Sequence, residues 1–327
     1  MAELRFGLIG LGVHGHRYAA HLQKDVPGAR LVAVCRRRRA EGEAWAAAHA
    51  VRYHARWQDL VADPQVDAVA VVATPDVNLE VTREAVRRKK HLVIEKPLAV
   101  NRETATRLVA AVSGAPIAVM VAQTLRWNSV VRTIKTHVAE IAPVHLVTLS
   151  QRMEPVHHAW QADREVAGGG NVLHTGVHLF DLLRFLTGDE VEHVSCEMRR
   201  LANPNLEDVF AAVMTLAGSG VRALVDSAKT TRSRSGRIEV VGEGGQLVGD
   251  HVHGFAKKIV GYDSIDLTIP PPVFTVRESL ADFVRAVAHG TQIPVSLVEG
   301  LRAVEIAEAC YHSAAEGRAV PVQRAFA

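Results

Sequence analysis

The chain has 327 residues, a length that predicts about two domains. Apolar residues make up 48% of it and charged residues 22%, which is ordinary for a globular protein and excludes disorder, collagen and coiled coil as the main architecture. The formal net charge is only +3, so bulk electrostatics gives no reason to expect nucleic acid or a membrane surface as a partner.

The cysteines and the apolar runs indicate the compartment. Cys35, Cys196 and Cys310 have neither paired nor metal-like spacing, which suits a reducing environment. The sequence enters a strand pattern at Leu4–Gly10 without a charged and then apolar leader. No apolar run approaches the ~18 residues that a membrane helix needs. We therefore expect a cytoplasmic protein.

The first third of the chain alternates between strand-like and helix-like segments. Strand-length apolar runs occupy Arg5–Ile9, Leu31–Val34, Ala68–Val72, His91–Glu95 and Ile117–Val121. Helix-length segments between them occupy His16–Lys24, Glu41–His49, Asn78–Arg88 and Arg102–Val112. The short runs are rich in Val and Ile and do not alternate with polar residues, which is typical of strands buried on both faces. This repetition predicts an α/β domain with a doubly wound parallel sheet over residues 1–122.

The pattern changes after residue 122. Helices are expected at Asn128–Ile141, Asn171–Leu186, Val276–His289 and Leu297–Ala315. Strands are expected at Val144–Arg152, Val191–Arg199, Val209–Leu216, Val221–Ser227, Ile238–Val241 and Leu247–Val248. The glycine-rich stretches Ala217–Gly220 and Gly242–Gly245 are typical of hairpin turns. We expect an α+β domain over residues 123–327, with an open mixed or antiparallel sheet and helices on one face. The C-terminal helices can alternatively pack against the first domain.

A glycine loop follows the first strand and opens the first helix. Its residues are Gly10, Leu11, Gly12, Val13, His14 and Gly15. Glycines at this spacing allow a tight turn, close approach of a pyrophosphate and close contact between helix and sheet, and the helix N-terminus offers free N–H groups to the phosphates. The context predicts a dinucleotide site formed by these residues. The alternative is a tight turn without a ligand.

The end of the second strand bears on the choice of cofactor. NAD-selective sites usually carry an acidic residue there, about 20 residues after the glycines. This chain has Arg36 instead, followed by Arg37, Arg38 and Arg39. Because a guanidinium can bind a 2′-phosphate in bidentate fashion, we predict a preference for NADP over NAD, with Arg36 and Arg37 in contact with the cofactor. The alternative is a solvated basic loop.

The fourth strand ends in the tripeptide Glu95–Pro97. Ligands of open parallel sheets bind beyond the carboxyl ends of the strands, where Lys96 is expected. Burial and a neighbouring cationic ring would both lower the pKa of this lysine. It is then a candidate for a proton shuttle or for a hydrogen-bond donor to a substrate hydroxyl. The alternative is a surface lysine at a strand end.

Three polar residues interrupt an otherwise apolar helical segment. His174, His178 and Asp181 are spaced i, i+4 and i+7, so we expect them on one helical face. Either histidine can act as a general base near neutral pH, the two can bind a metal, or they are core histidines held by hydrogen bonds. No glutamate follows His174 as in H-E-x-x-H, and no third ligand stands out; we therefore expect no metal.

Taken together, these motifs resemble the Gfo/Idh/MocA oxidoreductase family almost from end to end. The matching segments are Gly10–Gly15, Ala73–Asp76, Glu95–Pro97, Gln123–Asn128, Gly168–Asp181, Ile238–Leu247 and Ser279–Val322. The resemblance implies an NAD(P)-binding Rossmann domain and an α+β domain. The open sheet of the second domain often mediates oligomerisation in this family, so a homodimer or homotetramer is expected through it.

The resemblance also implies roles for individual residues. Lys96 matches the catalytic lysine of the family and His178 its catalytic histidine. Thr74 and Pro75 match a loop that lines the cofactor, and Glu95 matches a residue beside the nicotinamide and its ribose. The Lys96–Pro97 peptide bond matches one that is commonly cis, and Gln123 is counted among the cofactor contacts.

Two positions depart from the family pattern. Many sugar-oxidising members have an aspartate four residues before the catalytic histidine, where this chain has His174. A carboxylate that would orient His178 is therefore missing, and neighbouring histidines resist double protonation. Leu79 stands where the family often has a histidine. The sequence accordingly does not predict a simple Asp–His relay or an inositol-type substrate.

The leading hypothesis is reversible hydride transfer between nicotinamide C4 and a secondary alcohol or ketone of a sugar, a polyol or a related small molecule. His174, Arg126, Trp127 and Trp160 are candidate substrate contacts, because aromatic faces stack on sugar rings and arginine suits carboxylates or phosphates; packing or surface roles are the alternative. Two further hypotheses remain, a glycosidase of the same family that uses bound NAD for transient oxidation, and a non-catalytic redox sensor that binds NADP.

Overall fold

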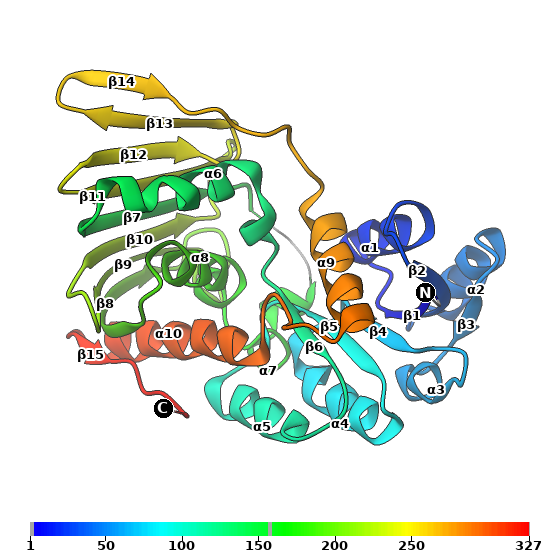
Figure 1. Cartoon of the computed structure of the whole chain (residues 1–327). Coiled ribbons are helices and arrows are strands. Elements are labelled where there is room, and N and C mark those ends of the chain that lie inside the picture. Colours follow the sequence, from blue (N-terminus) through cyan, green and yellow to red (C-terminus); the bar gives the residue numbers. More distant parts are fainter. Residues whose placement is uncertain (1–2, 156–158, 327) are drawn as a thin grey trace. The chain divides into compact units, whose positions relative to one another are not determined.

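The computed structural model describes residues 3–155 and 159–326. The chain divides into two compact units, and each is described by itself (Figure 1). The first comprises Met1–Ala99, Glu103–Thr124 and Phe274–Leu301, and the second comprises Val100–Arg102, Leu125–Val273 and Arg302–Ala327. The domain boundary after residue 122 stays a prediction.

The first unit is built on a parallel sheet. Its strands are β1 (Leu4–Ile9), β2 (Ala29–Cys35), β3 (Arg52–His54), β4 (Ala68–Val71), β5 (His91–Glu95) and β6 (Val119–Ala122). They follow the order β3-β2-β1-β4-β5-β6, and every pair is parallel. The predicted doubly wound sheet is therefore confirmed. The strand order reverses between β1 and β4, and ligands of such sheets bind beyond the carboxyl ends at this switch point.

Helices cover the sheet of the first unit. They are α1 (Val13–Lys24), α2 (Arg39–Ala48), α3 (Trp57–Ala62), α4 (Asn78–Arg88), α5 (Arg102–Val112) and α9 (Thr275–His289). Helix α9 comes from the C-terminal part of the chain and packs in the first unit. The centroids of the Phe283 and Phe6 rings lie 6.3 Å apart. The Arg277 guanidinium donates a hydrogen bond to the carbonyl of Asp25. Both phenylalanines are fully buried, so this helix contributes to the core of the first unit.

The second unit contains a large mixed sheet. Its strands are β7 (Val144–Arg152), β8 (Val191–Arg199), β9 (Val209–Leu216), β10 (Arg222–Ala228), β11 (Ser235–Gly242), β12 (Gly245–Asp250), β13 (Phe255–Val260), β14 (Asp263–Asp266) and β15 (Val320–Pro321). Within the described residues they follow the order β14-β13-β12-β11-β7-β10-β9-β8-β15. Only β7 and β10 pair in parallel there. The predicted open mixed sheet and both predicted hairpins, β9–β10 and β11–β12, are confirmed.

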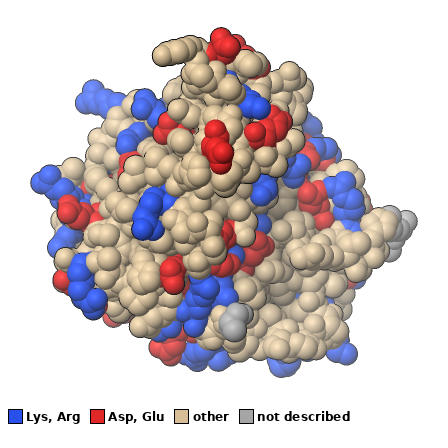
Figure 2. Space-filling model, turned by 60° about the vertical axis from the view of Figure 1, so that its left-hand side comes forward, with Lys and Arg blue, Asp and Glu red and all other residues tan. Residues whose placement is uncertain are grey.

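Within the part of the chain that the structure describes, helices cover one face of this sheet and leave the other face uncovered. Helices α6 (Ser129–His137), α8 (Val177–Thr187) and α10 (Leu297–Glu316) lie on the same side of it (Figure 1). The strands alternate accordingly: Ala223 and Val225 of β10 are buried, while Leu224 between them is 41% exposed. Acidic and basic side chains are interspersed over the face of the molecule shown in Figure 2, in keeping with the small net charge. None of the described helices combines the length and the apolar character needed to cross a membrane.

The segment Asn171–Leu186 differs from the single α-helix that the sequence predicted. The chain first forms a π-helical turn, η5 (Val172–Gly176), and only then the α-helix α8. The backbone N–H groups of Gly170 and Val172 donate to the side chain of Glu207, outside the segment. The start of this segment is therefore held by tertiary contacts, which cannot be predicted from the apolar periodicity of the sequence. Short helical turns also precede it, at η4 (Ala159–Ala162) and α7 (Arg164–Ala167).

Candidate functional site

The glycine loop of the first unit has open space beside one glycine, where a ligand can lie. Beside two other glycines there is no room even for a Cβ atom. A Cβ on Gly10, whose φ is +99°, would lie 2.1 Å from the carbonyl oxygen of Val72. A Cβ on Gly15 would lie 2.0 Å from the carbonyl oxygen of Gly10. A Cβ on Gly12, the residue that precedes α1, would meet nothing within 4 Å. The backbone is therefore closed on the protein side and open at the helix N-terminus, as binding of a pyrophosphate requires.

The buried carboxylate of Glu95 ties this loop to the end of β5. Its Oε1 lies 2.8 Å from Nε2 of His14 and accepts a 2.6 Å hydrogen bond from the Tyr18 hydroxyl. Its Oε2 accepts a hydrogen bond from the backbone N–H of Lys96. Burial alone would raise the pKa of Glu95, but the bond with His14, the charges of His14 and Lys96 and the Tyr18 bond lower it overall. An ionised carboxylate thus connects two predicted site motifs.

Lys96 lies directly beyond the carboxyl end of β5. Burial lowers the pKa of its ammonium, and the neighbouring Glu95 carboxylate opposes this shift. The direction is the one that the sequence predicted for a lysine at this place. The peptide bond between Lys96 and Pro97 is cis, as the family resemblance implied.

Other predicted cofactor residues follow neighbouring strands. Thr74 and Pro75 come after β4, where Pro75 begins the short helical turn η1 (Pro75–Val77). Gln123 comes directly after β6 and is 2% exposed. Since β4, β5 and β6 are adjacent and parallel, the fold brings these residues and Glu95 to one edge of the sheet.

Acidic side chains of α2 engage the arginines that follow β2. The Arg36 guanidinium donates to the carbonyl of Leu11 in the glycine loop and forms an ion pair with Glu41. Arg38 also contacts Glu41, and Arg39 pairs with Glu43 at 2.8 Å, while Arg37 is exposed. The position of Arg36 beside the loop agrees with a cofactor contact. The sequence analysis did not identify Glu41 as the ion-pair partner of Arg36, although the sequence places Glu41 in the first turn of the helix that follows.

In the second unit, His178 differs from its neighbours in exposure. It is partly exposed, whereas the residues on either side of it, from Asn171 to Leu183, are buried. His174 is 7% exposed, and its Nε2 lies 3.0 Å from the carbonyl oxygen of Ala167. Its imidazole ring packs edge-on against the Trp160 ring, with 5.2 Å between the two ring centroids. The structure therefore brings together two of the predicted substrate residues, His174 and Trp160, at the start of the segment that carries His178.

The other two predicted substrate residues have internal contacts. The guanidinium of Arg126 forms a bidentate ion pair with Asp181, with bonds of 2.8 and 2.7 Å, and these side chains are 11% and 2% exposed. Trp127 is 3% exposed. Across the described ranges, no cluster of three or more His, Cys, Asp or Glu side chains is arranged to hold a metal ion.

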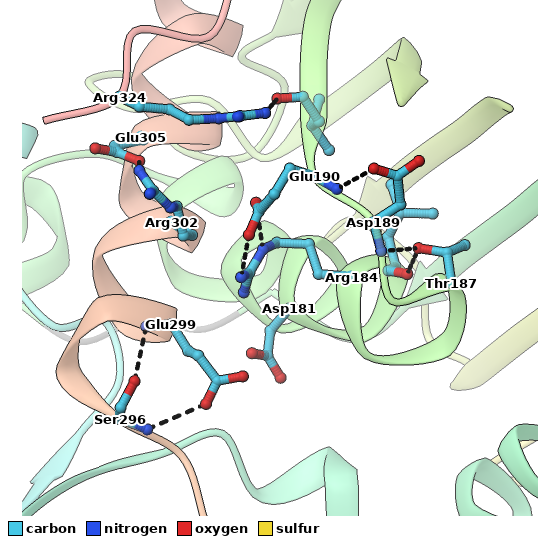
Figure 3. A network of polar contacts seen from close by, with 12 residues as sticks. Asp181, Arg184, Thr187, Asp189, Glu190, Ser296, Glu299, Arg302, Glu305 and Arg324 are labelled. Carbon is cyan, nitrogen blue, oxygen red and sulfur yellow. Dashed lines mark hydrogen bonds and ion pairs between the residues drawn. The ribbon is translucent and has the colours of Figure 1, made fainter. Parts of the chain in front are cut away.

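The far end of α8 is held by a second ion pair. Figure 3 shows Arg184 and Glu190 joined by two bonds, of 2.8 and 2.6 Å, beside the turn that leaves the helix. In that turn, Asp189 accepts hydrogen bonds from the backbone of Gly218 and Ser219. The helix is thus fixed to the sheet at its C-terminal end.

A Rossmann-type sheet with an open glycine cradle and a lysine at its carboxyl edge is typical of a nicotinamide-dependent oxidoreductase. The comparison with protein families agrees: residues 4–123 match the NAD-binding Rossmann fold of the Gfo/Idh/MocA oxidoreductases, and residues 135–323 match their C-terminal alpha/beta domain. The chain belongs to this family. It is an NAD(P)-binding enzyme of the sugar and polyol oxidoreductases.

Individual relatives cover most of the chain. An inositol 2-dehydrogenase from Rhizobium meliloti is 27% identical over 335 residues, which are 98% of this chain and 99% of the relative. A 1,5-anhydro-D-fructose reductase from Ensifer adhaerens is 31% identical over 270 residues, which are 81% and 74% of the two chains. The solved structure of a levoglucosan dehydrogenase with NADH and L-sorbose superposes with a TM-score of 0.89 at 20% identity, covering 99% of this chain and 100% of that one. This last likeness shows the fold alone.

Proposed function

We propose that the enzyme transfers a hydride between nicotinamide C4 and a carbon that bears a secondary hydroxyl in a sugar, a polyol or a related small molecule. The bound nicotinamide supplies the hydride acceptor or donor. His178 takes the hydroxyl proton, or returns it in the reductive direction. Lys96 donates a hydrogen bond to the same oxygen and stabilises its developing negative charge.

The observation that carries this proposal is the position of Lys96. The lysine follows β5 at the carboxyl edge of the sheet, and its neighbour Glu95 is bonded to His14 of the glycine loop. A lowered ammonium pKa brings its proton affinity closer to that of a working acid or base. The partial exposure of His178 within a buried segment supports its role as the proton acceptor. We assign His174 and Trp160 to substrate binding.

The substrate class in this proposal is taken from the named relatives. One acts on inositol and another on 1,5-anhydro-D-fructose, and both names denote ring compounds rich in hydroxyl groups. We propose a substrate of the same kind, with the reacting carbon flanked by further hydroxyls. Because His174 stands where an aspartate would support the histidine, we do not extend the proposal to inositol itself.

NADP is the proposed cofactor, with Arg36 as the ligand of its 2′-phosphate. Arg36 already lies against the glycine loop through the carbonyl of Leu11. A 2′-phosphate would take the place of Glu41 on this guanidinium, and Arg37 would add a second positive charge. The exchange leaves Glu41 beside a phosphate, so the preference over NAD depends on how far Glu41 moves away.

We also propose a homo-oligomer that forms through the face of the nine-stranded sheet that no helix covers. On this sheet, Val213 of β9 is 49% exposed and Leu224 of β10 is 41% exposed, and an interface would bury both. Light scattering coupled to size-exclusion chromatography should give a dimer or tetramer for the wild type. A Val213→Glu variant that keeps the wild-type mass would refute this interface.

The test of the catalytic proposal uses two variants and two matched controls. Lys96→Met and His178→Ala should each lower turnover by about 10²- to 10⁴-fold, the usual contribution of an acid or base, while NADPH still binds. Lys24→Met and His193→Ala change exposed residues of the same types and should leave turnover unchanged. The assay follows nicotinamide absorbance over a panel of polyols, aldoses and keto sugars.

The same assay separates the other two hypotheses. A glycosidase that oxidises its substrate transiently would release product without net change in nicotinamide absorbance, and would retain its cofactor through purification. A redox sensor would bind NADPH but turn over no member of the panel. Turnover with a net absorbance change excludes both.

A further inference from the structure

A buried carboxylate and a phenol hold the start of the segment that carries His178. Oε1 of Glu207 accepts hydrogen bonds from the backbone N–H groups of Gly170 and Val172, both at 3.0 Å. The hydroxyl of Tyr311, on α10, donates to the same oxygen at 2.8 Å. Neither Glu207 nor Tyr311 was a candidate in the sequence, and neither has a role in the proposed chemistry.

The two glycines beside this contact have no room for a side chain. A Cβ on Gly169 would lie 2.0 Å from the hydroxyl oxygen of Tyr311, and a Cβ on Gly170 would lie 2.1 Å from the carbonyl oxygen of Glu207. The N–H of Asn171 donates to that same carbonyl at 2.8 Å. The glycines that lead into the helix are therefore required by Glu207 and Tyr311.

The Glu207 carboxylate lies in a buried environment and is bonded by uncharged donors. Its bonds to Gly170, Val172 and Tyr311 all come from uncharged donors. Burial raises the pKa of its carboxyl, and these bonds only partly offset the shift. The pKa of Tyr311 is raised well above its ordinary value by burial and by Glu207, so its hydroxyl stays a donor. An acidic group at the N-terminus of a helical segment also complements the positive end of the helix dipole.

The π-helical turn η5 comes directly after these contacts and leads into α8, which carries His178 in its first turn. π-helical turns are rare and are frequent at functional sites, and this one begins at Val172, a residue bonded to Glu207. The other end of α8 is held by Arg184 and Glu190. The backbone that carries His178 is therefore held near both ends of the segment.

We propose that Glu207 and Tyr311 are positioning residues for His178, which they orient through the backbone of Gly170 and Val172. This inference rests on the proposed function, in which His178 moves the substrate proton. Displacement of a catalytic group by about 1 Å costs up to ~10²-fold in rate. Loss of the Glu207 contact should therefore lower kcat without affecting the cofactor loop, which belongs to the other unit.

The first experiment compares Glu207→Ala with Glu207→Gln. The alanine variant should lower kcat about 10- to 100-fold, with little change in KM and in the Kd for NADPH. The glutamine variant keeps an oxygen that can accept the two backbone bonds, so it should recover most of the lost rate. Glu165→Ala, which removes an exposed carboxylate from nearby α7, is the control and should behave as wild type.

A second experiment keeps the inference testable should Glu207→Ala fail to fold. Gly169→Ala places a methyl group 2.0 Å from the Tyr311 hydroxyl oxygen and 2.8 Å from the ring carbon Cζ, so it should lower kcat, and the loss of the oxygen relieves the closer of the two clashes. Tyr311→Phe removes that oxygen, and the double variant should regain part of the rate. An equal loss from Gly169→Ala in both backgrounds would overturn the inference.

A purely structural role of Glu207 and Tyr311 would give a different result. In that case Glu207→Ala and Tyr311→Phe would lower the melting temperature, while kcat per folded molecule would stay at the wild-type value. Failure of the proposed function would be seen elsewhere, as wild-type turnover in His178→Ala. The two failures are therefore distinguishable.

Discussion

The ion pair between Arg126 and Asp181 allows a quantitative prediction about stability and substrate binding. Asp181 and Arg126 are 2% and 11% exposed and share two hydrogen bonds. Asp181→Ala leaves the guanidinium buried without its carboxylate, which typically costs about 3–5 kcal/mol. A domain of about 150–250 residues loses roughly 2–4 °C of melting temperature per kcal/mol, so we expect a fall of roughly 6–20 °C.

Two further variants give this prediction its controls. Arg126→Met combined with Asp181→Leu replaces the pair by apolar side chains of similar volume, and such replacements are often neutral or stabilising. Glu80→Ala breaks an ion pair with Arg83 whose members are both about half exposed, and surface pairs of this kind contribute little. Both should therefore melt close to the wild-type temperature.

The assay is thermal unfolding followed by circular dichroism, combined with KM measurements on the stable double variant. Because Asp181 already occupies the guanidinium of Arg126 in two bonds, we expect KM to change little. A melting temperature for Asp181→Ala within a few degrees of wild type would refute the reasoning about burial. A large rise in KM in the double variant would instead identify Arg126 as a substrate ligand.

Three further predictions concern the first unit. Gly10→Ala should abolish tight NADPH binding because its methyl group meets a backbone carbonyl, whereas Gly114→Ala, also at positive φ but in open space, should leave binding unchanged; fluorescence titration compares the two. Since the pKa of Glu95 is lowered in the fold, its ionised form stabilises the protein above the ordinary pKa of about 4.3, and this contribution is lost as the pH falls through the folded pKa. Urea unfolding between neutral and acidic pH should therefore lose less stability in Glu95→Gln than in wild type, and an unchanged slope would contradict this. Arg36→Ala should weaken NADPH binding more than NADH binding, and Glu41→Gln should do the reverse; an unaltered affinity ratio in both variants would exclude Arg36 as the 2′-phosphate ligand.

Much of the fold was predictable because its strands are local apolar runs. Strands β1, β4 and β5 are buried along most of their length and stand out without any tertiary information. Strands β3 and β14 were missed because the first is short and half-buried and the second is exposed, so neither has a hydrophobic pattern. The hydrophobic pattern of a sequence therefore predicts a strand only where one side of that strand is buried.

The π-helical turn at Val172–Gly176 was missed for a different reason. Every residue of this turn is buried, the polar His174 and Thr175 included, so the hydrophobic pattern does not distinguish a π-helical turn from an α-helical one. The first residue of the turn, Val172, is bonded to Glu207, which lies 35 residues further along the chain. Such contacts are tertiary and leave no local signal.

The candidate site divides in the same way. The glycine loop and the tripeptide Glu95–Pro97 are contiguous motifs, and the sequence predicted both. The bond between His14 and Glu95 joins residues 81 positions apart in the sequence. These residues come together because β1 pairs with β4, and β4 pairs with β5, in one parallel sheet. A signal for Glu207 was present, since two adjacent acidic residues precede a half-buried strand, but the sequence did not show which residue Glu207 would contact.

The most direct test of the account is a double-mutant cycle on turnover with Lys96→Met and His178→Ala. Residues that act as a unit on one reacting group give strongly non-additive losses. If both side chains act on the same hydroxyl, the double variant should be little slower than the slower of the two single variants, while all three still bind NADPH. A double variant whose loss equals the product of the two single losses would contradict the claim that this amine and this imidazole serve one oxygen atom.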